Sequence, residues 1–249
     1  MAMDVPRIAC FHGGGSNSGI FAFQCRRLQH LLADHYELVF FDAPYEREGG
    51  PGVLPFFADY APFRTWIAPA SSSVEEEDGL DRVLYLMHSD TLRRKEEARL
   101  QGKIIEPGPW VGAMGFSQGT RVVSGLLWRQ QQQQQQQQQK NPTIFNPRLE
   151  FGIVCMGSAK PMGAEQRDAT TDVPRVDEEP ITIPTLHLHG LRDAILPKSR
   201  DQLAIYFHHD AVRLMEINYH HAMPWYKPDV EAFVQLIKET HKRGLEVGK

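Results

Sequence analysis

The sequence predicts an α/β fold, in which a mostly parallel sheet is covered by helices on both faces. Six short apolar runs alternate along the chain with longer segments of helical periodicity, an order typical of repeated strand–helix units. The runs are apolar almost throughout, as expected for strands that are buried on both faces. They are Arg7–Phe11, Glu37–Phe41, Trp110–Met114, Glu150–Cys155, Thr185–His189 and Val212–Ile217.

Three helices are predicted from apolar residues that recur at intervals of three and four. The first contains Leu80–Met87, the second Val122–Leu127 and the third Val230–Ile237. The third segment is preceded by Pro228 and Asp229. A proline in the first turn and an acid near the positive end of the dipole both favour a helix start there.

Length and composition favour one domain, or two small ones, in a reducing compartment. The chain has 249 residues, enough to bury a catalytic pocket, and its net charge of -4 provides no basic field for nucleic acid. Cys10, Cys25 and Cys155 are scattered, which argues against a disulfide framework. Met1–Arg7 has no features of a secretion signal. The sequence also has no run of about 18 apolar residues, the length needed to span a bilayer. We therefore expect a cytoplasmic protein with no membrane partner.

Three segments interrupt the alternation of strands and helices. Asp42–Gly79 is long and rich in proline and glycine, and long connections of this kind are often functional. Met156–Pro180 is a second excursion, either a lid or a solvated loop. We expect the aromatic side chains of the first segment to contact the substrate. They are Phe56, Phe57, Tyr60, Phe63 and Trp66.

Gln130–Gln139 is an uninterrupted glutamine run that follows the second predicted helix. We expect a solvent-exposed helix extension or a loop, whose deletion leaves activity intact. Because glutamine tracts can self-associate, an interaction protein assembled through this run is an alternative class of function.

A candidate nucleophile follows the third predicted strand. Trp110–Met114 runs into Gly115-Phe116-Ser117-Gln118-Gly119, and a helical pattern comes next. A G-x-S-x-G string between a strand and a helix is typical of a nucleophile elbow, which projects the serine hydroxyl above the sheet. The alternative is a glycine–serine turn without catalysis. We predict that Ser117 is the nucleophile.

A serine hydroxyl needs a base to remove its proton and a carboxylate to orient that base. Asp193 follows the strand Thr185–His189, and the adjacent His220 and His221 follow the next strand. The three groups thus leave the carboxyl ends of strands, where open α/β sheets bind their ligands. We predict Asp193 as the acid and one of the two histidines as the base.

The first predicted strand ends in His12-Gly13-Gly14-Gly15, and glycines allow close backbone approach to a substrate oxygen. Acyl transfer needs at least two preorganised N–H donors at that oxygen. We predict that these are the backbone N–H groups of Gly14 and Gln118. A dinucleotide-binding loop is disfavoured because the glycine spacing does not match G-x-G-x-x-G.

Two further sets of residues have alternative interpretations. His187 and His189 alternate on one predicted strand and could bind zinc together with His12, but no acid stands at a familiar ligand spacing. We therefore expect neither a metal nor another cofactor. Arg121, one helical turn after Ser117, either meets a carboxylate of the substrate or is a surface residue.

These strings together resemble the fungal family of serine hydrolases (FSH), over nearly the whole chain. The matching strings are Phe11–Gly15, Gly115–Gly119, His187–Asp193 read as HLHGLRD, and His221 with Pro224 as an H-x-x-P motif. The resemblance implies an α/β-hydrolase fold across residues 1–249, and the last motif implies that His221 rather than His220 is the base.

The segment Gly50–Asp59, with Trp66 downstream, is similar to thioesterases of this family that are encoded beside polyketide synthases. That similarity implies hydrolysis of an acyl thioester or ester to release a polyketide-type product, with an acyl carrier domain of a synthase as a partner. The alternatives are a general carboxylesterase and a non-catalytic module that binds a small molecule in the same fold.

Overall fold

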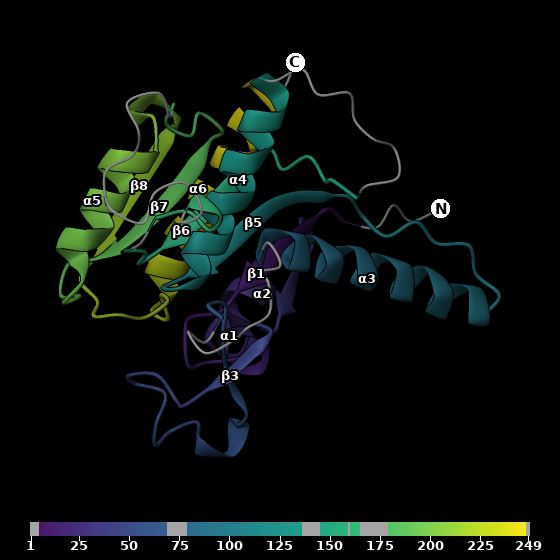
Figure 1. Ribbon diagram of the computed structural model, residues 1–249, viewed down its shortest axis with the longest axis horizontal. Coiled ribbons are helices and arrows are strands. Elements are labelled where there is room, and N and C mark those ends of the chain that lie inside the picture. Colours follow the sequence, from purple (N-terminus) through teal and green to yellow (C-terminus); the bar gives the residue numbers. More distant parts are fainter. Residues whose placement is uncertain (1–4, 69–78, 136–144, 159, 165–178, 248–249) are drawn as a thin grey trace.

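The structure is a computed structural model that describes residues 5–68, 79–135, 145–158, 160–164 and 179–247. Its centre is a six-stranded sheet in which every neighbouring pair is parallel (Figure 1). The sheet confirms the predicted α/β class and all six predicted strands. In spatial order the strands are β2 Glu37–Phe41, β1 Arg7–Phe11, β5 Trp110–Phe116, β6 Phe151–Cys155, β7 Thr185–Gly190 and β8 Val212–Ile217.

Six α-helices are described, and three of them contain the predicted helical segments. The described helices are α1 Ser18–Gln24, α2 Arg26–Leu32, α3 Gly79–Leu100, α4 Gly119–Gln135, α5 Leu196–Tyr206 and α6 Lys227–Val247. The first two are only two turns each, too short for a periodic signal to stand out in the sequence. Asn17 caps α1, since its Oδ1 accepts a hydrogen bond from the N–H of Ile20 at 2.9 Å.

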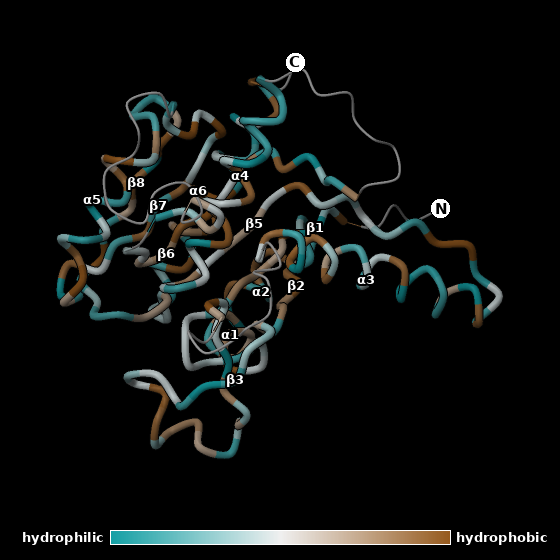
Figure 2. Tube along the Cα trace, viewed as in Figure 1, coloured by the Kyte–Doolittle hydropathy of each residue, from teal (hydrophilic) through white to brown (hydrophobic). Residues whose placement is uncertain are grey.

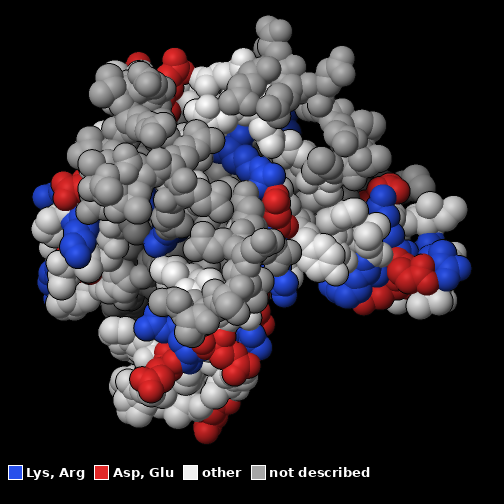
Figure 3. Space-filling view, in the orientation of Figure 1, with Lys and Arg blue, Asp and Glu red and all other residues white. Residues whose placement is uncertain are grey.

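Two apolar clusters, one on each face of the sheet, form the core. Successive residues of β1 point to opposite sides, so Ile8 and Cys10 pack with α1, α2 and α6, while Ala9 and Phe11 pack with α3 and α4. The strands are accordingly among the most hydrophobic parts of the chain (Figure 2). The far end of α3 extends beyond the sheet, and its surface carries interleaved acidic and basic side chains (Figure 3).

The glutamine run is partly structural, which corrects the expectation of a solvent-exposed segment. α4 continues to Gln135, and the side chains of Gln130 and Gln131 are buried. The Gln130 amide accepts from the N–H of Leu149 and donates to its carbonyl, both at 2.8 Å. Gln131 pairs in the same way with the backbone near Thr182. These amides satisfy backbone groups just before β6 and β7. Gln136–Gln139 lie outside the described residues.

The two long excursions differ in how much of them is described. Residues 42–68 form a small antiparallel pair, β3 Tyr45–Arg47 with β4 Phe63–Thr65, and a 3₁₀ turn over Ala58–Tyr60. Most of the second excursion, residues 165–178, is outside the described residues, so the lid remains a prediction. A second 3₁₀ turn, His209–Ala211, precedes β8.

All three cysteines are free and buried. Within the described residues, no helix combines the length and the apolar character needed to cross a bilayer.

Candidate active site

Ser117 lies in a strained turn at the carboxyl end of β5, directly before α4. Its φ of 52° is in the left-handed region that residues other than glycine rarely adopt. The flanking glycines make the turn possible: a Cβ at Gly115 would collide with the backbone of Gly119, and a Cβ at Gly119 with the carbonyl of Phe11. The N–H of Ser117 donates to the carbonyl of Cys155 at 2.9 Å, which ties the turn to β6.

Asp193 and His221 form a hydrogen-bonded pair. Oδ2 of Asp193 lies 2.7 Å from Nδ1 of His221, and Oδ1 accepts from the N–H of Ile195 at 3.0 Å. The Asp193 side chain is 2% exposed and that of His221 is 35% exposed. The neighbouring His220 instead lies 2.9 Å from the carbonyl of Arg192 through its own Nδ1. Because Asp193 occupies Nδ1 of His221, Nε2 is the nitrogen that can take a proton from a substrate-side group.

Aromatic packing brings the serine turn and the histidine loop together. The ring of Phe116, the residue before Ser117, lies 4.9 Å from the His221 ring between centroids. β6 and β7 separate β5 from β8 in the sheet, so the loops after the strands make this approach.

The sequence did not indicate that Met156 contacts the loop after β8, which carries His220 and His221. This residue follows β6, has a φ of 51°, and its sulfur accepts from the N–H of Ala222 at 3.2 Å. A methionine at a strand end carries no catalytic pattern, so no sequence signal could have marked this contact.

The glycine loop after β1 lies against the serine turn. A Cβ at Gly13 would stand 3.3 Å from Cβ of Ser117, and one at Gly14 would stand 3.1 Å from Cδ of Gln118. Within the described part of the chain, the N–H groups of Gly14 and Gln118 donate to no other residue. The two predicted donors therefore sit on adjacent loops, with N–H groups available to a ligand.

His12 is a buried structural residue of this loop. Its Nε2 accepts from the N–H of Ala43 at 3.0 Å, so the proton is on Nδ1, which donates to the carbonyl of Gly13 at 2.7 Å. Burial lowers the pKa of His12 and keeps the ring neutral. Since the backbone engages both nitrogens, the zinc alternative with His187 and His189 does not fit the geometry.

The predicted aromatic contact residues differ in how deeply they are buried. Phe63 and Trp66 are buried in packing clusters, while Phe57 is half-buried. Phe56 and Tyr60 are 85% and 42% exposed. Phe56 and Tyr60 are therefore the most accessible of the five.

Arg121 is half-buried. Its pKa is lowered by desolvation, with a smaller opposing effect from the Tyr206 phenol of α5. Arg121 is therefore not an ordinary surface arginine.

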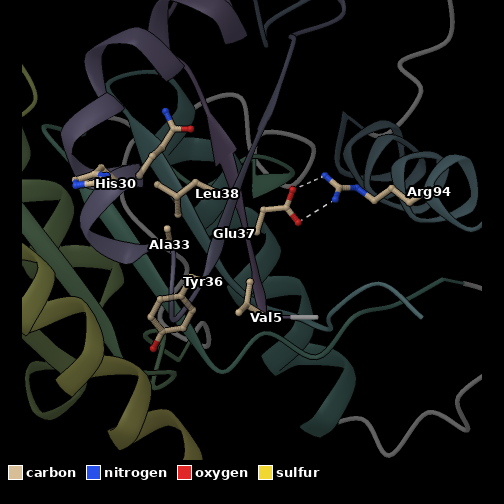
Figure 4. A pocket seen from close by; sticks show the side chains of 8 residues that line it. Val5, His30, Ala33, Tyr36, Glu37, Leu38 and Arg94 are labelled. Atoms are coloured by element: carbon tan, nitrogen blue, oxygen red, sulfur yellow. Dashed lines mark hydrogen bonds and ion pairs between the residues drawn. The ribbon is translucent and has the colours of Figure 1, made fainter. Parts of the chain in front are cut away.

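A separate cavity of about 580 Å³ lies at the amino end of β2 (Figure 4). The ion pair between Glu37 and Arg94 borders it, and Oη of Tyr36 lies 2.7 Å from Nδ1 of His241. These polar groups already have partners. Because the cavity is at the opposite end of the strands from Ser117, it does not belong to the candidate site.

Known proteins resemble this chain over nearly its whole length. Residues 1–233 match the family model described as serine hydrolase (FSH1). The esterase claE of Penicillium crustosum is 34% identical over 262 residues, which cover 96% of this chain and 93% of that protein. The esterase GME11355 of Pestalotiopsis microspora is 32% identical over 258 residues, which cover 96% and 92%.

Solved structures share the fold at low sequence identity. Acyl-protein thioesterase 2 of Zea mays superposes with a TM-score of 0.56 at 17% identity, covering 96% of this chain and 95% of that chain. Arabidopsis thaliana SOBER1 gives 0.52 at 16% identity, covering 96% and 99%.

The parallel sheet, the strained serine turn and the Asp–His pair at its carboxyl edge define a hydrolase of the α/β-hydrolase fold. The chain belongs to the serine hydrolase (FSH1) family, and its curated relatives are named esterases.

Proposed function

We propose that this enzyme hydrolyses acyl esters or thioesters, with Ser117 as nucleophile, His221 as base and Asp193 as the group that orients the imidazole. The observation that carries the proposal is the 2.7 Å hydrogen bond from His221 to Asp193, beside a serine with a φ of 52°. The nearly buried carboxylate stabilises the imidazolium that forms during catalysis.

In the proposed reaction, Ser117 Oγ attacks the acyl carbonyl while Nε2 of His221 takes its proton. The N–H groups of Gly14 and Gln118 stabilise the oxyanion, and the tetrahedral intermediate collapses as His221 returns the proton to the leaving alcohol or thiol. Water, deprotonated by His221, then attacks the acyl-serine and releases the carboxylic acid and Ser117.

The experiment that tests these roles is covalent labelling with a fluorophosphonate, followed by intact-mass measurement of the adduct. We expect one adduct on the native enzyme, none on Ser117→Ala, and none on His221→Ala within the same labelling time. An adduct on Ser117→Ala would overturn the assignment of the nucleophile. An unlabelled native protein would favour the non-catalytic binding module.

We further propose a polyketide-type acyl substrate, delivered by an acyl carrier domain in the cytoplasm. This finer proposal is supported by the resemblance of Gly50–Asp59 to cluster thioesterases, and by free cysteines that suit a reducing compartment. The exposed Phe56 of that segment and the adjoining Tyr60 are the most accessible of the five aromatic side chains for an acyl chain or its carrier.

A general carboxylesterase is the second candidate, favoured by the names of the curated relatives. Matched substrates decide between the two, because the same triad acts on both bonds. We expect a higher kcat/KM for an acyl N-acetylcysteamine thioester than for the ethyl ester of the same acid. The reverse order would favour the carboxylesterase.

A further inference from the structure

Trp66 is hydrogen-bonded to both loops that carry the proposed oxyanion donors. Its backbone N–H donates to Oε1 of Gln118 at 2.9 Å, and its indole Nε1–H donates to the carbonyl of His12 at 2.9 Å. Gln118 lies in the serine turn, and His12 begins the glycine loop. One residue therefore spans the place where the two donors must converge.

Trp66 is buried and packed against the start of the glycine loop. The side chain is 4% exposed, and its ring lies 5.3 Å from the His12 ring between centroids. Arg64, two residues before Trp66, is paired with the glycine loop. Its carbonyl accepts from the N–H of Gly15 at 2.8 Å, and its N–H donates to the carbonyl of Ser16 at 2.7 Å. The Trp66 indole and the backbone of β4 therefore contact the same loop.

The Gln118 side chain transmits this contact to the other donor. Its Oε1 also accepts from the hydroxyl of Thr65 at 3.0 Å, and the amide lies against Gly14, where an added Cβ would be only 3.1 Å from Cδ. The amide thus fills the space between β4 and the glycine loop. If it rotated away, Gly14 would lose the neighbour that limits its position.

We propose that Trp66 is a positioning residue, which fixes the separation of the Gly14 and Gln118 N–H groups and so acts on the transition state. This inference rests on the proposed function, in which those groups are the oxyanion donors. Preorganised donors stabilise developing charge only when they are held within tenths of an ångström. The role replaces the expectation that Trp66 lines the acyl pocket, since its ring is buried within the fold.

The test uses Trp66→Phe, which removes the indole N–H and keeps an aromatic ring. We expect kcat to fall roughly 10- to 100-fold while KM for a p-nitrophenyl ester changes by less than about threefold. The inhibition constant of a boronic acid should rise by a factor similar to the loss in kcat. The boronate adduct with Ser117 places an oxygen between the N–H groups of Gly14 and Gln118, as the transition state does.

Trp110→Phe is the matched control. Trp110 is 5% exposed in the same core cluster, and its indole donates to Oγ1 of Thr91 at 3.2 Å, at the amino end of β5. We expect a comparable loss of stability with kcat and boronate affinity unchanged. Gln118→Met, which removes the acceptor from the other side, should reproduce the signature of Trp66→Phe and decides the question if Trp66→Phe does not fold.

The positioning role is overturned if Trp66→Phe or Gln118→Met behaves like Trp110→Phe in kcat and boronate affinity, or if the loss falls on KM alone. Ser117→Ala is measured in parallel to separate the two proposals. Activity that survives in Ser117→Ala refutes the proposed function itself. An inactive Ser117→Ala beside an unimpaired Trp66→Phe refutes only the role of Trp66.

Discussion

Oδ2 of Asp193 lies 2.7 Å from Nδ1 of His221, a residue 28 positions further along the chain. The loop after β7 places the carboxylate, and the loop after β8 places the imidazole. Only 2% of the Asp193 side chain is exposed, so little water solvates its charge. The hydrogen bond to His221 therefore stabilises the buried carboxylate as well as orienting the imidazole.

The pairing predicts that His221 and His220 differ in function although they are neighbours. Asp193→Asn should lower kcat by roughly 10³- to 10⁴-fold, because the amide favours the wrong imidazole tautomer. His220→Ala should leave kcat within about threefold, since the exposed His220 side chain pairs through Nδ1 with the backbone carbonyl of Arg192. Steady-state kinetics on a p-nitrophenyl ester measures both. Equal losses in His220→Ala and His221→Ala would contradict the assignment.

The strain at Ser117 predicts an unusual ranking of two inactive variants. Both Ser117→Ala and Ser117→Gly remove the nucleophile, but only glycine adopts a φ of 52° without steric strain. Urea unfolding should show Ser117→Gly to be more stable than Ser117→Ala by about 1 kcal/mol. If the alanine variant were the more stable of the two, the turn would be unstrained.

Buried His187 predicts a loss of stability in mild acid. Desolvation, with a smaller effect from His189, lowers the pKa of His187 to about 3. In the unfolded chain the His187 imidazole has a pKa of about 6.5, so below this pH it binds a proton that the folded chain does not bind. The free energy of unfolding is therefore highest above pH 6.5 and decreases as the pH falls toward 3. At pH 5 the expected loss is about 2 kcal/mol.

Urea unfolding at pH 7.5 and pH 5 measures this loss. His187→Gln should reduce the difference between the two pH values by about 2 kcal/mol, whatever its effect on absolute stability. The exposed His220→Gln is the control and should leave the difference unchanged. The same pH dependence in His187→Gln as in the native protein would mean that His187 titrates normally.

The glutamine run predicts two neighbouring substitutions with different costs. Gln130→Ala leaves the buried N–H and carbonyl of Leu149 unsatisfied, which should destabilise the protein by about 1–3 kcal/mol. Gln134→Ala, on the exposed side of the same helix, should change stability by less than about 0.5 kcal/mol. Thermal unfolding of both variants is the measurement, and equal midpoints would show that the run is uniformly exposed.

Local patterns sufficed for the strands and for the candidate site in outline. Each of the six sheet strands is an apolar run of the sequence, and periodicity marked α4 and α6. The order of Ser117, Asp193 and the histidine pair along the chain was enough to place them at one sheet edge, because parallel strands end on the same side.

Contacts between distant segments could not be predicted in this way. Trp66 looked like a pocket aromatic, yet it donates to His12, 54 residues away. Gln130 looked like part of an exposed tract, yet it pairs with Leu149. A side chain's type does not tell which backbone group will face it, since that depends on how separate elements pack.

The sequence by itself determined that this chain forms a parallel α/β sheet with a serine turn, because hydrophobic periodicity and flanking glycines act over a few residues. The H-x-x-P motif implied His221 as the base, and tertiary structure decided that its ring contacts Asp193 and which residues hold the glycine loop in place. Those choices depend on distances between loops remote in the chain, and packing of the whole domain sets such distances.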